Sequence, residues 1–149
     1  MPDEDGTLYV HGSVAAGWLR ASTDTTVCVT ITELDGLVAG RSAFHHSMNY
    51  RSVVVLGRAS VVTDDDEKDR GLRAVVDHMV AGRSQECRPP SPEELRATRV
   101  VRVPLTEASA KVRTGPPIED PADLDPPEWW GGVVPLTTVL GEPTPDAYV

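Results

Sequence analysis

The sequence predicts an antiparallel β-barrel with peripheral helices, a fold that is mainly β. Segments in which apolar and polar residues alternate recur along the chain, and turn residues such as Asp-Gly and Gly-Ser separate them. Helical patterns are few and short. Strands joined by short turns pair antiparallel and bury one face, so an all-antiparallel core with helices outside it follows. The 149 residues suffice for one core, and we expect residues 1–149 to form a single domain.

The N-terminal half supplies two of the predicted strands. We expect residues 1–6 to be frayed and Thr7–His11 to form a short, half-buried strand. Ser13 is expected to cap the short helical turn that follows it. Thr26–Thr32 alternates strictly and predicts a strand with one buried face. The Asp-Gly pair at 35–36 predicts a tight hairpin turn, with the returning strand running from residue 37 toward residue 44.

The C-terminal half contains a predicted central strand, two helices and a tail. Val53–Val62 is apolar on both alternating faces apart from Arg58, which is typical of a strand covered on both sides. An apolar stripe at helical spacing between residues 72 and 80 predicts an amphipathic helix closed by Gly82. A capping-box sequence predicts a second, short helix that ends by Ala97. Further strands are expected at 99–105 and 108–113, and residues 114–149 form a Pro-rich, acidic tail.

Charge and composition restrict the function. The formal charge is −9, which disfavours a nucleic-acid surface. All 14 basic residues lie between Arg20 and Arg113, so a compact anion such as a phosphorylated cofactor remains possible there, although scattered surface arginines explain the same pattern. No apolar run is long enough to span a membrane. Cys28 and Cys87 read as reduced thiols in a chain without a signal peptide, and we expect a cytoplasmic location.

The stretch from Phe44 to Leu56 is the densest group of functional side chains. Two adjacent histidines, an amide, a phenol, a guanidinium and hydroxyls precede an apolar run, which indicates a binding loop that leads into a buried strand. A metal site would draw on His11, His45, His46 and Glu33, but no spaced ligand set completes it, and we expect no metal. Serine-hydrolase, P-loop and dinucleotide-binding motifs are absent from the sequence.

Four sequence blocks together resemble one family. They are Leu-Tyr-Val-His-Gly-Ser at 8–13, the strand and Asp-Gly block at 27–38, the long block at 42–57, and Ser-Ala-Lys-Val-Arg-Thr-Gly at 109–115. This pattern resembles the pyridoxamine 5′-phosphate oxidase-like flavoproteins, in the branch related to 5-nitroimidazole-resistance proteins. The resemblance implies a split-barrel fold, a homodimer, FMN in a cleft at the dimer interface, and oxidation or reduction of a small-molecule substrate.

The resemblance also implies which residues hold the cofactor. His11, as the tentative catalytic residue, matches the family histidine near the flavin. Gly12 and Ser13 match the turn that binds the flavin phosphate in the family. Trp129 or Trp130 matches an aromatic residue of the family's tail. The remaining cofactor-binding residues that it implies are Asn49, Tyr50, Arg51, Ser52, Lys111 and Arg113. Of these, Arg51, Lys111 and the Ser13 turn are expected to hold the anionic end of FMN.

Two departures from the family support a competing hypothesis. Relatives carry a basic residue where this chain has Gly17 and Trp18, so one charged contact to the phosphate is lost. Relatives also begin earlier, with a helix and a first hairpin, and a barrel without those strands has open edges. The competing hypothesis is a non-catalytic family member that acts as a dimeric binding or interaction protein without flavin.

Overall fold

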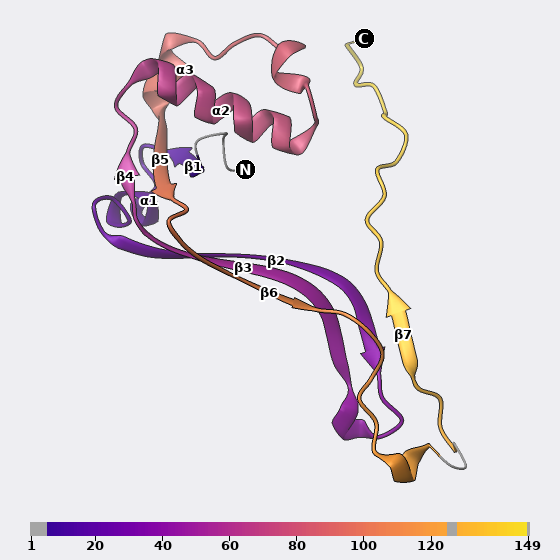
Figure 1. Ribbon diagram of the computed structural model, residues 1–149. Coiled ribbons are helices and arrows are strands. Elements are labelled where there is room, and N and C mark those ends of the chain that lie inside the picture. Colours follow the sequence, from indigo (N-terminus) through magenta and orange to yellow (C-terminus); the bar gives the residue numbers. More distant parts are fainter. Residues whose placement is uncertain (1–5, 125–127, 149) are drawn as a thin grey trace. The chain divides into compact units, whose positions relative to one another are not determined.

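The computed structural model describes residues 6–124 and 128–148, and within these residues the strands form two sheets. The three-stranded sheet has the order β1-β5-β4 and the four-stranded sheet has the order β6-β3-β2-β7 (Figure 1). The strands are β1 (Thr7–Ser13), β2 (Thr26–Ala39), β3 (Ser47–Arg58), β4 (Ser60–Val61), β5 (Thr98–Pro104), β6 (Glu107–Arg113) and β7 (Gly132–Pro135). The helices are α1 (Gly17–Ala21), α2 (Asp65–Met79) and α3 (Pro92–Ala97), with short 3-10 turns η1 (Ala43–His45), η2 (Arg83–Gln85) and η3 (Pro121–Asp123). The predicted fold class, mainly β with peripheral helices, is confirmed.

The chain divides into two compact units. Unit 1 consists of Met1–Thr30 with Val54–Ser109, and unit 2 consists of Ile31–Val53 with Ala110–Val149. Five residues of the segment predicted to be frayed, 1–5, lie outside the described residues. Among the described helices, none is long and apolar enough to cross a membrane.

The core of unit 1 is organised around β5, which is apolar on both faces. Val101 and Val103 pack with Leu8 and Leu19 on one face, while Val100 packs with Tyr9 and Val62 on the other. β1 pairs with β5 antiparallel over its whole length, and β4 pairs with the other edge of β5. Because both edges and both faces of β5 are covered, this strand fixes the position of everything else in unit 1.

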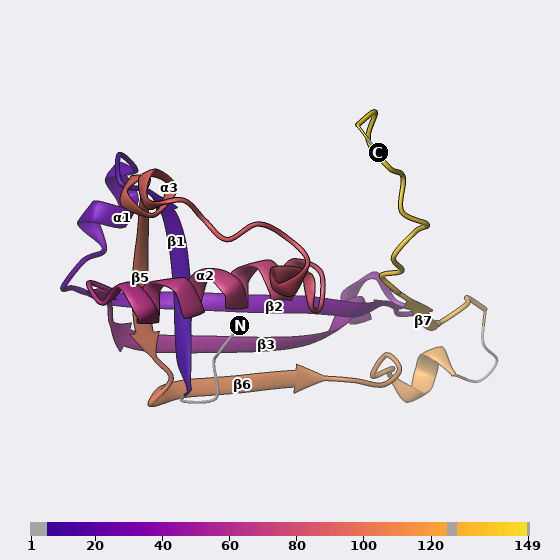
Figure 2. The same cartoon turned by 90° about the horizontal axis from the view of Figure 1, so that it is seen from above.

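Helix α2 covers the face of the β1-β5-β4 sheet that carries Tyr9. Figure 2 shows the helix lying across β1 and β5. Asp64 caps its first turn by accepting a hydrogen bond from the Glu67 N–H at 2.7 Å. A glycine in the middle of a helix is normally unfavourable, but Gly71 has the Tyr9 ring directly above it: a Cβ there would lie 3.1 Å from the ring. The close approach of helix to sheet therefore depends on Gly71.

The predicted hairpin at Asp35 and Gly36 is wrong. β2 runs without a turn through both residues, and Gly36 is not among the glycines with positive φ. A Cβ on Gly36 would lie 3.0 Å from the Val133 side chain, so this glycine allows β7 to approach β2. The hairpin instead joins β2 to β3 through η1, which makes Phe44 part of a 3-10 turn and not the end of a strand.

Three further local predictions need correction, whereas both predicted helices are present. Ser13 does not cap a helix; its Oγ accepts from the Ala15 N–H at 3.1 Å, and α1 begins only at Gly17, with Ala16 as its N-cap. The strand predicted as covered on both sides breaks at Ala59, where the chain passes from one sheet to the other, and Leu56 is exposed. The amphipathic helix and the capping box of α3, which ends at Ala97, are confirmed. Gly82 does not close α2, because the helix ends at Met79 with Val80 as its C-cap and Gly82 caps η2 instead.

Replacing Gly36 with valine tests its role in holding β7. The added side chain would collide with Val133 and with the backbone carbonyl of Val134, so β7 should detach from β2. The Leu136 N–H, which donates to the Asp35 carbonyl at 3.1 Å, should lose its protection from hydrogen exchange.

Leu37→Val serves as the matched control, because Leu37 lies on the same strand with an exposed side chain. Unchanged protection of the Leu136 N–H in Gly36→Val would contradict this account.

Candidate functional site

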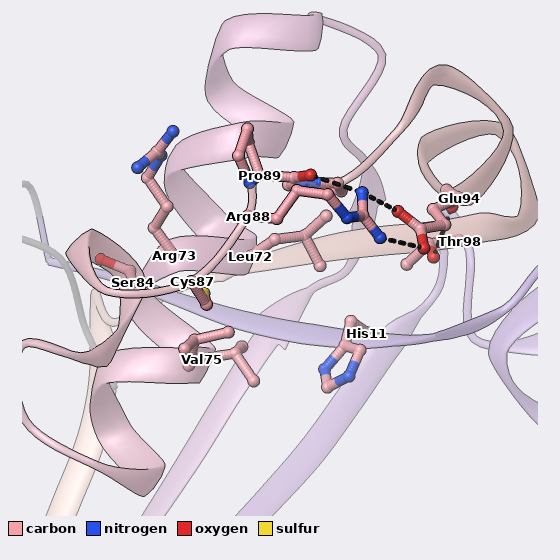
Figure 3. Close-up of a pocket in the computed structure, with 12 residues that line it drawn as sticks. His11, Leu72, Arg73, Val75, Ser84, Cys87, Arg88, Pro89, Glu94 and Thr98 are labelled. Carbon is pink, nitrogen blue, oxygen red and sulfur yellow. Dashed lines mark hydrogen bonds and ion pairs between the residues drawn. The ribbon is translucent and has the colours of Figure 1, made fainter. Parts of the chain in front are cut away.

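A cavity of about 350 Å³ in unit 1 is the first candidate site. Leu72, Val75 and Val76 of α2 and the Pro89-Pro90 segment form its apolar wall. The polar lining consists of His11, Arg73, Ser84, Cys87, Arg88, Glu94 and Thr98. Figure 3 shows the His11 ring and the Arg88–Glu94 pair on opposite sides of the cavity. An apolar pocket of this size with a few polar groups at its edge has the character of a small-molecule site.

The β1-β5 pairing carries His11 to this cavity. His11 lies opposite Val100 in the antiparallel register, two residues from the buried Tyr9 on the same strand. Residues two apart on a strand share a face, so His11 lies on the side of the sheet that α2 covers. Among the described residues, the His11 ring has no hydrogen-bond partner in the protein, which leaves both ring nitrogens for a ligand.

The rim opposite His11 is built by the capping box of α3. The Glu94 carboxylate accepts from the Ser91 N–H at 2.6 Å, while the Ser91 hydroxyl accepts from the Glu94 N–H. The same carboxylate binds Arg88 through two hydrogen bonds of 3.0 and 2.8 Å, and Arg88 also donates to the Pro89 carbonyl. The paired guanidinium and the backbone bond lower the pKa of Glu94 to about 2. The capped start of α3 thus holds the Arg88–Pro90 segment, which forms the rim of the cavity.

The remaining charges around the cavity are paired within α2 and η2. Arg73 bonds Asp69 at 2.6 Å, and this ion pair raises the pKa of Arg73. Asp77 accepts from the backbone and the hydroxyl of Ser84, both at 2.7 Å, which lowers the pKa of its carboxyl. Cys28 and Cys87 are both free thiols, as the sequence predicted. The charged groups around the cavity are therefore paired. The apolar wall of the cavity and the unpartnered His11 ring determine which ligand it can bind.

The predicted cofactor residues of unit 2 lie on β3 and β6, which are neighbours in the sheet. Asn49 is buried, and its side chain accepts from Arg113 at 2.5 Å and donates to the Gly115 carbonyl at 3.1 Å. The Lys111 ammonium lies 6.0 Å from the centre of the Tyr50 ring, a cation–π distance. Within the described part of the chain, neither Lys111 nor Arg113 has a carboxylate partner. These two residues are the uncompensated positive charges of that sheet surface.

Arg51 stands in a different electrostatic setting. It binds Glu33 at 2.6 Å and Asp35 at 3.0 Å, and this pairing raises the pKa of Arg51 and lowers that of Asp35. The trio carries a net negative charge. Two carboxylates therefore offset the attraction of Arg51 for an anionic ligand, although its side chain is 60% exposed.

The site residues predicted from the sequence lie in both units. Gly12 and Ser13 adjoin His11 on β1, and of all the predicted residues only His11 lines the cavity of unit 1. Ser52 bonds Thr32 across β3 and β2 at 2.8 Å. Trp129 and Trp130 are exposed. The rim residues Arg88 and Glu94 were missed as site residues, although the capping-box pattern at 91–94 was a visible signal for their position.

The comparisons place the chain in a family. The family described as pyridoxamine 5′-phosphate oxidase matches residues 3–112, which is most of the chain. The chain belongs to this family. No curated protein matches the sequence significantly.

Solved structures give more detail. The chain is 40% identical to the flavocytochrome Anf3 from Azotobacter vinelandii, with a TM-score of 0.87, over 97% of this chain and 67% of that one. It is 36% identical to an FAD- and heme-binding protein from Mycobacterium smegmatis, with a TM-score of 0.88, over 97% of this chain and 71% of that one. A candidate 5-nitroimidazole antibiotic resistance protein from Bacteroides thetaiotaomicron, 23% identical with a TM-score of 0.57 over 73% of this chain and 63% of that one, shares the fold.

Acid should loosen the rim of the cavity through Glu94. Its pKa in the folded protein is about 2, below the ordinary value of 4.5, so the carboxylate stabilises the fold fully above pH 4.5. That contribution should decline as the pH falls from 4.5 toward 2. Glu94→Gln should therefore lower the thermal midpoint at neutral pH and match the wild type near the acid end of a pH series.

Glu93→Gln, in the same helical turn but without the bond to the Ser91 N–H, is the control and should keep the wild-type pH profile. A gap between wild type and Glu94→Gln that stays constant with pH would contradict the pairing.

Proposed function

We propose that this protein binds a flavin and works as a flavin-dependent oxidoreductase of small molecules. The observation that carries the proposal is the unpartnered His11 at an apolar cavity in a family member that resembles flavin proteins along nearly its whole length. FMN is the flavin that the family resemblance implies, whereas the M. smegmatis protein binds FAD. The two flavins share the isoalloxazine ring and the first phosphate, and a titration separates them.

The cavity of unit 1 suits the ring of a flavin. Its volume of about 350 Å³ and its walls of Leu72, Val75 and Val76 match a flat ligand with apolar faces. His11 has ring nitrogens free to donate to, or accept from, the polar edge of such a ring. A bound flavin would supply the electron transfer, because its ring can take up and release electrons. The chain's own part is to orient the ring, exclude water and hold a proton at His11.

The resemblance to the family implies that Arg51, Lys111 and the Ser13 turn hold the anionic end of the cofactor. The geometry ranks the basic residues of unit 2: Lys111 and Arg113 have no carboxylate partner in the described chain, whereas Arg51 is neutralised by Glu33 and Asp35. Lys111 and Arg113 are thus the stronger candidates for a phosphate contact, and Arg51 is a weaker one because two carboxylates already offset its charge.

A fluorescence titration with FMN and with FAD tests the proposal. Wild type should quench the fluorescence of at least one flavin and bind it saturably. His11→Ala should weaken that binding by up to about tenfold, through loss of a hydrogen bond from a side chain that is exposed in the unliganded protein. His78→Ala is the matched control, since His78 is exposed near the end of α2 and outside the cavity. Lys111→Ala, Arg113→Ala and Arg51→Ala measure the three candidate phosphate contacts in the same assay.

The outcomes separate the hypotheses. Absence of binding with both flavins would favour the competing hypothesis of a non-catalytic interaction protein. Equal loss in His11→Ala and His78→Ala would remove His11 from the site. The expected homodimer is tested in parallel by sedimentation with and without flavin.

Heme is a second candidate cofactor, because the two most identical structures named above are a flavocytochrome and an FAD- and heme-binding protein. A histidine is a common axial ligand of heme iron, and the chain has four histidines. Hemin titration should produce a Soret band in the wild type that one single His→Ala variant loses. A wild type without that band would remove heme from the candidates.

A further inference from the structure

One histidine of the His45-His46 pair lies in a cluster that the proposed function does not use. His45, Asp120 and Asp123 each offer one ligand atom, and these atoms all lie within 4.8 Å of one another. All three residues belong to unit 2, and none of them lines the His11 cavity. His45 and Asp120 are 75 residues apart in the sequence, so spacing along the chain does not reveal them as ligands of one site.

The histidine is held firmly by its turn. Ser42 caps η1 by accepting from the Phe44 N–H, and the Phe44 ring packs edge-on against His45 at 5.3 Å. Gly40 lies directly against His45, where an added Cβ would lie 2.7 Å from the His45 Cβ and 2.8 Å from its backbone carbonyl carbon. The His45 side chain is only 17% exposed, so its ring has little freedom to turn away.

The two carboxylates are placed on one side of a single 3-10 turn. Asp120 precedes η3 and Asp123 ends it, and the Asp123 N–H donates to the Asp120 carbonyl at 2.9 Å. Residues three apart eclipse in a 3-10 helix, so both side chains lie on the same face. An Asp at this position normally caps the helix through its side chain, but Asp120 makes no such bond. Its carboxylate lies 3.4 Å from the His45 Nε2 instead.

A buried ion pair fixes the two segments against each other. The Arg41 backbone N–H and guanidinium donate to Glu119 at 3.0 and 3.1 Å, and the Glu119 side chain is 6% exposed. Gly131 packs over this pair, since a Cβ there would lie 2.6 Å from Glu119 and 2.8 Å from Arg41. The residue before Asp120 is therefore anchored beside the β2–β3 connection that carries His45.

Charge favours a cation at this cluster. Two carboxylates face one imidazole, and the segment beyond Arg113 has seven acidic residues and no basic one. Of these seven, Glu119 is paired with Arg41. Like charges this close disfavour each other unless a positive charge lies between them.

We propose that His45, Asp120 and Asp123 bind a divalent transition-metal ion of the zinc class. One imidazole nitrogen and two carboxylate oxygens are ligands that suit such ions, whereas Mg²⁺ and Ca²⁺ prefer oxygen alone. Ligand atoms about 2.0–2.2 Å from a tetrahedral ion lie about 3.3–3.6 Å apart. The 3.4 Å between the His45 Nε2 and the Asp120 carboxylate already has this spacing, and the Asp123 carboxylate, within 4.8 Å of both, would move toward them by about 1 Å. The remaining coordination positions go to water. The ion would tie the start of the acidic tail to the β2–β3 connection.

Calorimetric titration of metal-stripped full-length chain with ZnCl₂ tests the site. Wild type should bind one zinc ion saturably, and His45→Gln and Asp123→Asn should each weaken binding about tenfold to a hundredfold. His46→Gln and Glu142→Gln are matched controls from the same histidine pair and the same tail, and both should bind as wild type does. MgCl₂ in place of ZnCl₂ should give no saturable binding at the same concentrations.

Cobalt provides a second readout that is independent of affinity. Co²⁺ bound by the three side chains should give visible d–d bands, which should vanish in His45→Gln and Asp123→Asn while circular dichroism shows both variants folded. No saturable zinc binding by wild type would overturn the proposal, and so would wild-type affinity in His45→Gln. Either result would leave the cluster as a plain histidine–aspartate ion pair. Flavin plays no part in these measurements, so they stand apart from the proposed function.

Discussion

Coverage of β5 on both edges and both faces is the constraint on which the rest of unit 1 depends. Val100 and Val101 point to opposite faces, and each is almost fully buried in a different cluster. β1 must pair along β5 for its leucine and tyrosine to reach those clusters, and α2 must cover the Tyr9 side. The cavity beside His11 is what remains between that helix, the strand pair and the capped start of α3. Packing, and not any catalytic requirement, therefore sets where the candidate site lies.

Charge pairing decides which side chains remain for a ligand. Around the cavity of unit 1 the charged groups are paired with one another, so the His11 ring and the free Cys87 thiol are left among the polar lining for recognition. On the sheet of unit 2, Arg51 is occupied by carboxylates while Lys111 and Arg113 are not, within the described chain. Residue identity alone treats these three basic side chains as equivalent, and their partners make them different.

Much of the fold could be predicted from the sequence, because the relevant signals are local. The capping box of α3, the stripe of α2 and the alternation of β1 each determine structure within a few residues. The signal at Asp35-Gly36 was misleading, since the glycine serves the distant β7 and not a turn. The candidate site shows the same division: the sequence predicted His11 as a site residue, whereas only the pairing of distant segments brings Glu94 to the cavity that His11 also lines. Such long-range partners leave no periodic trace in the chain.

The central claim, that this family member carries a flavin, is tested most directly by the absorbance spectrum of the protein as purified. Supplying riboflavin during expression and then releasing the bound cofactor by denaturation identifies it by chromatography as FMN or FAD. The account predicts the two absorption bands of an oxidised flavin, one in the near-ultraviolet and one in the blue. It also predicts that close to one flavin is released per chain. A colourless protein that releases no flavin, and that stays colourless after incubation with both flavins, would contradict it.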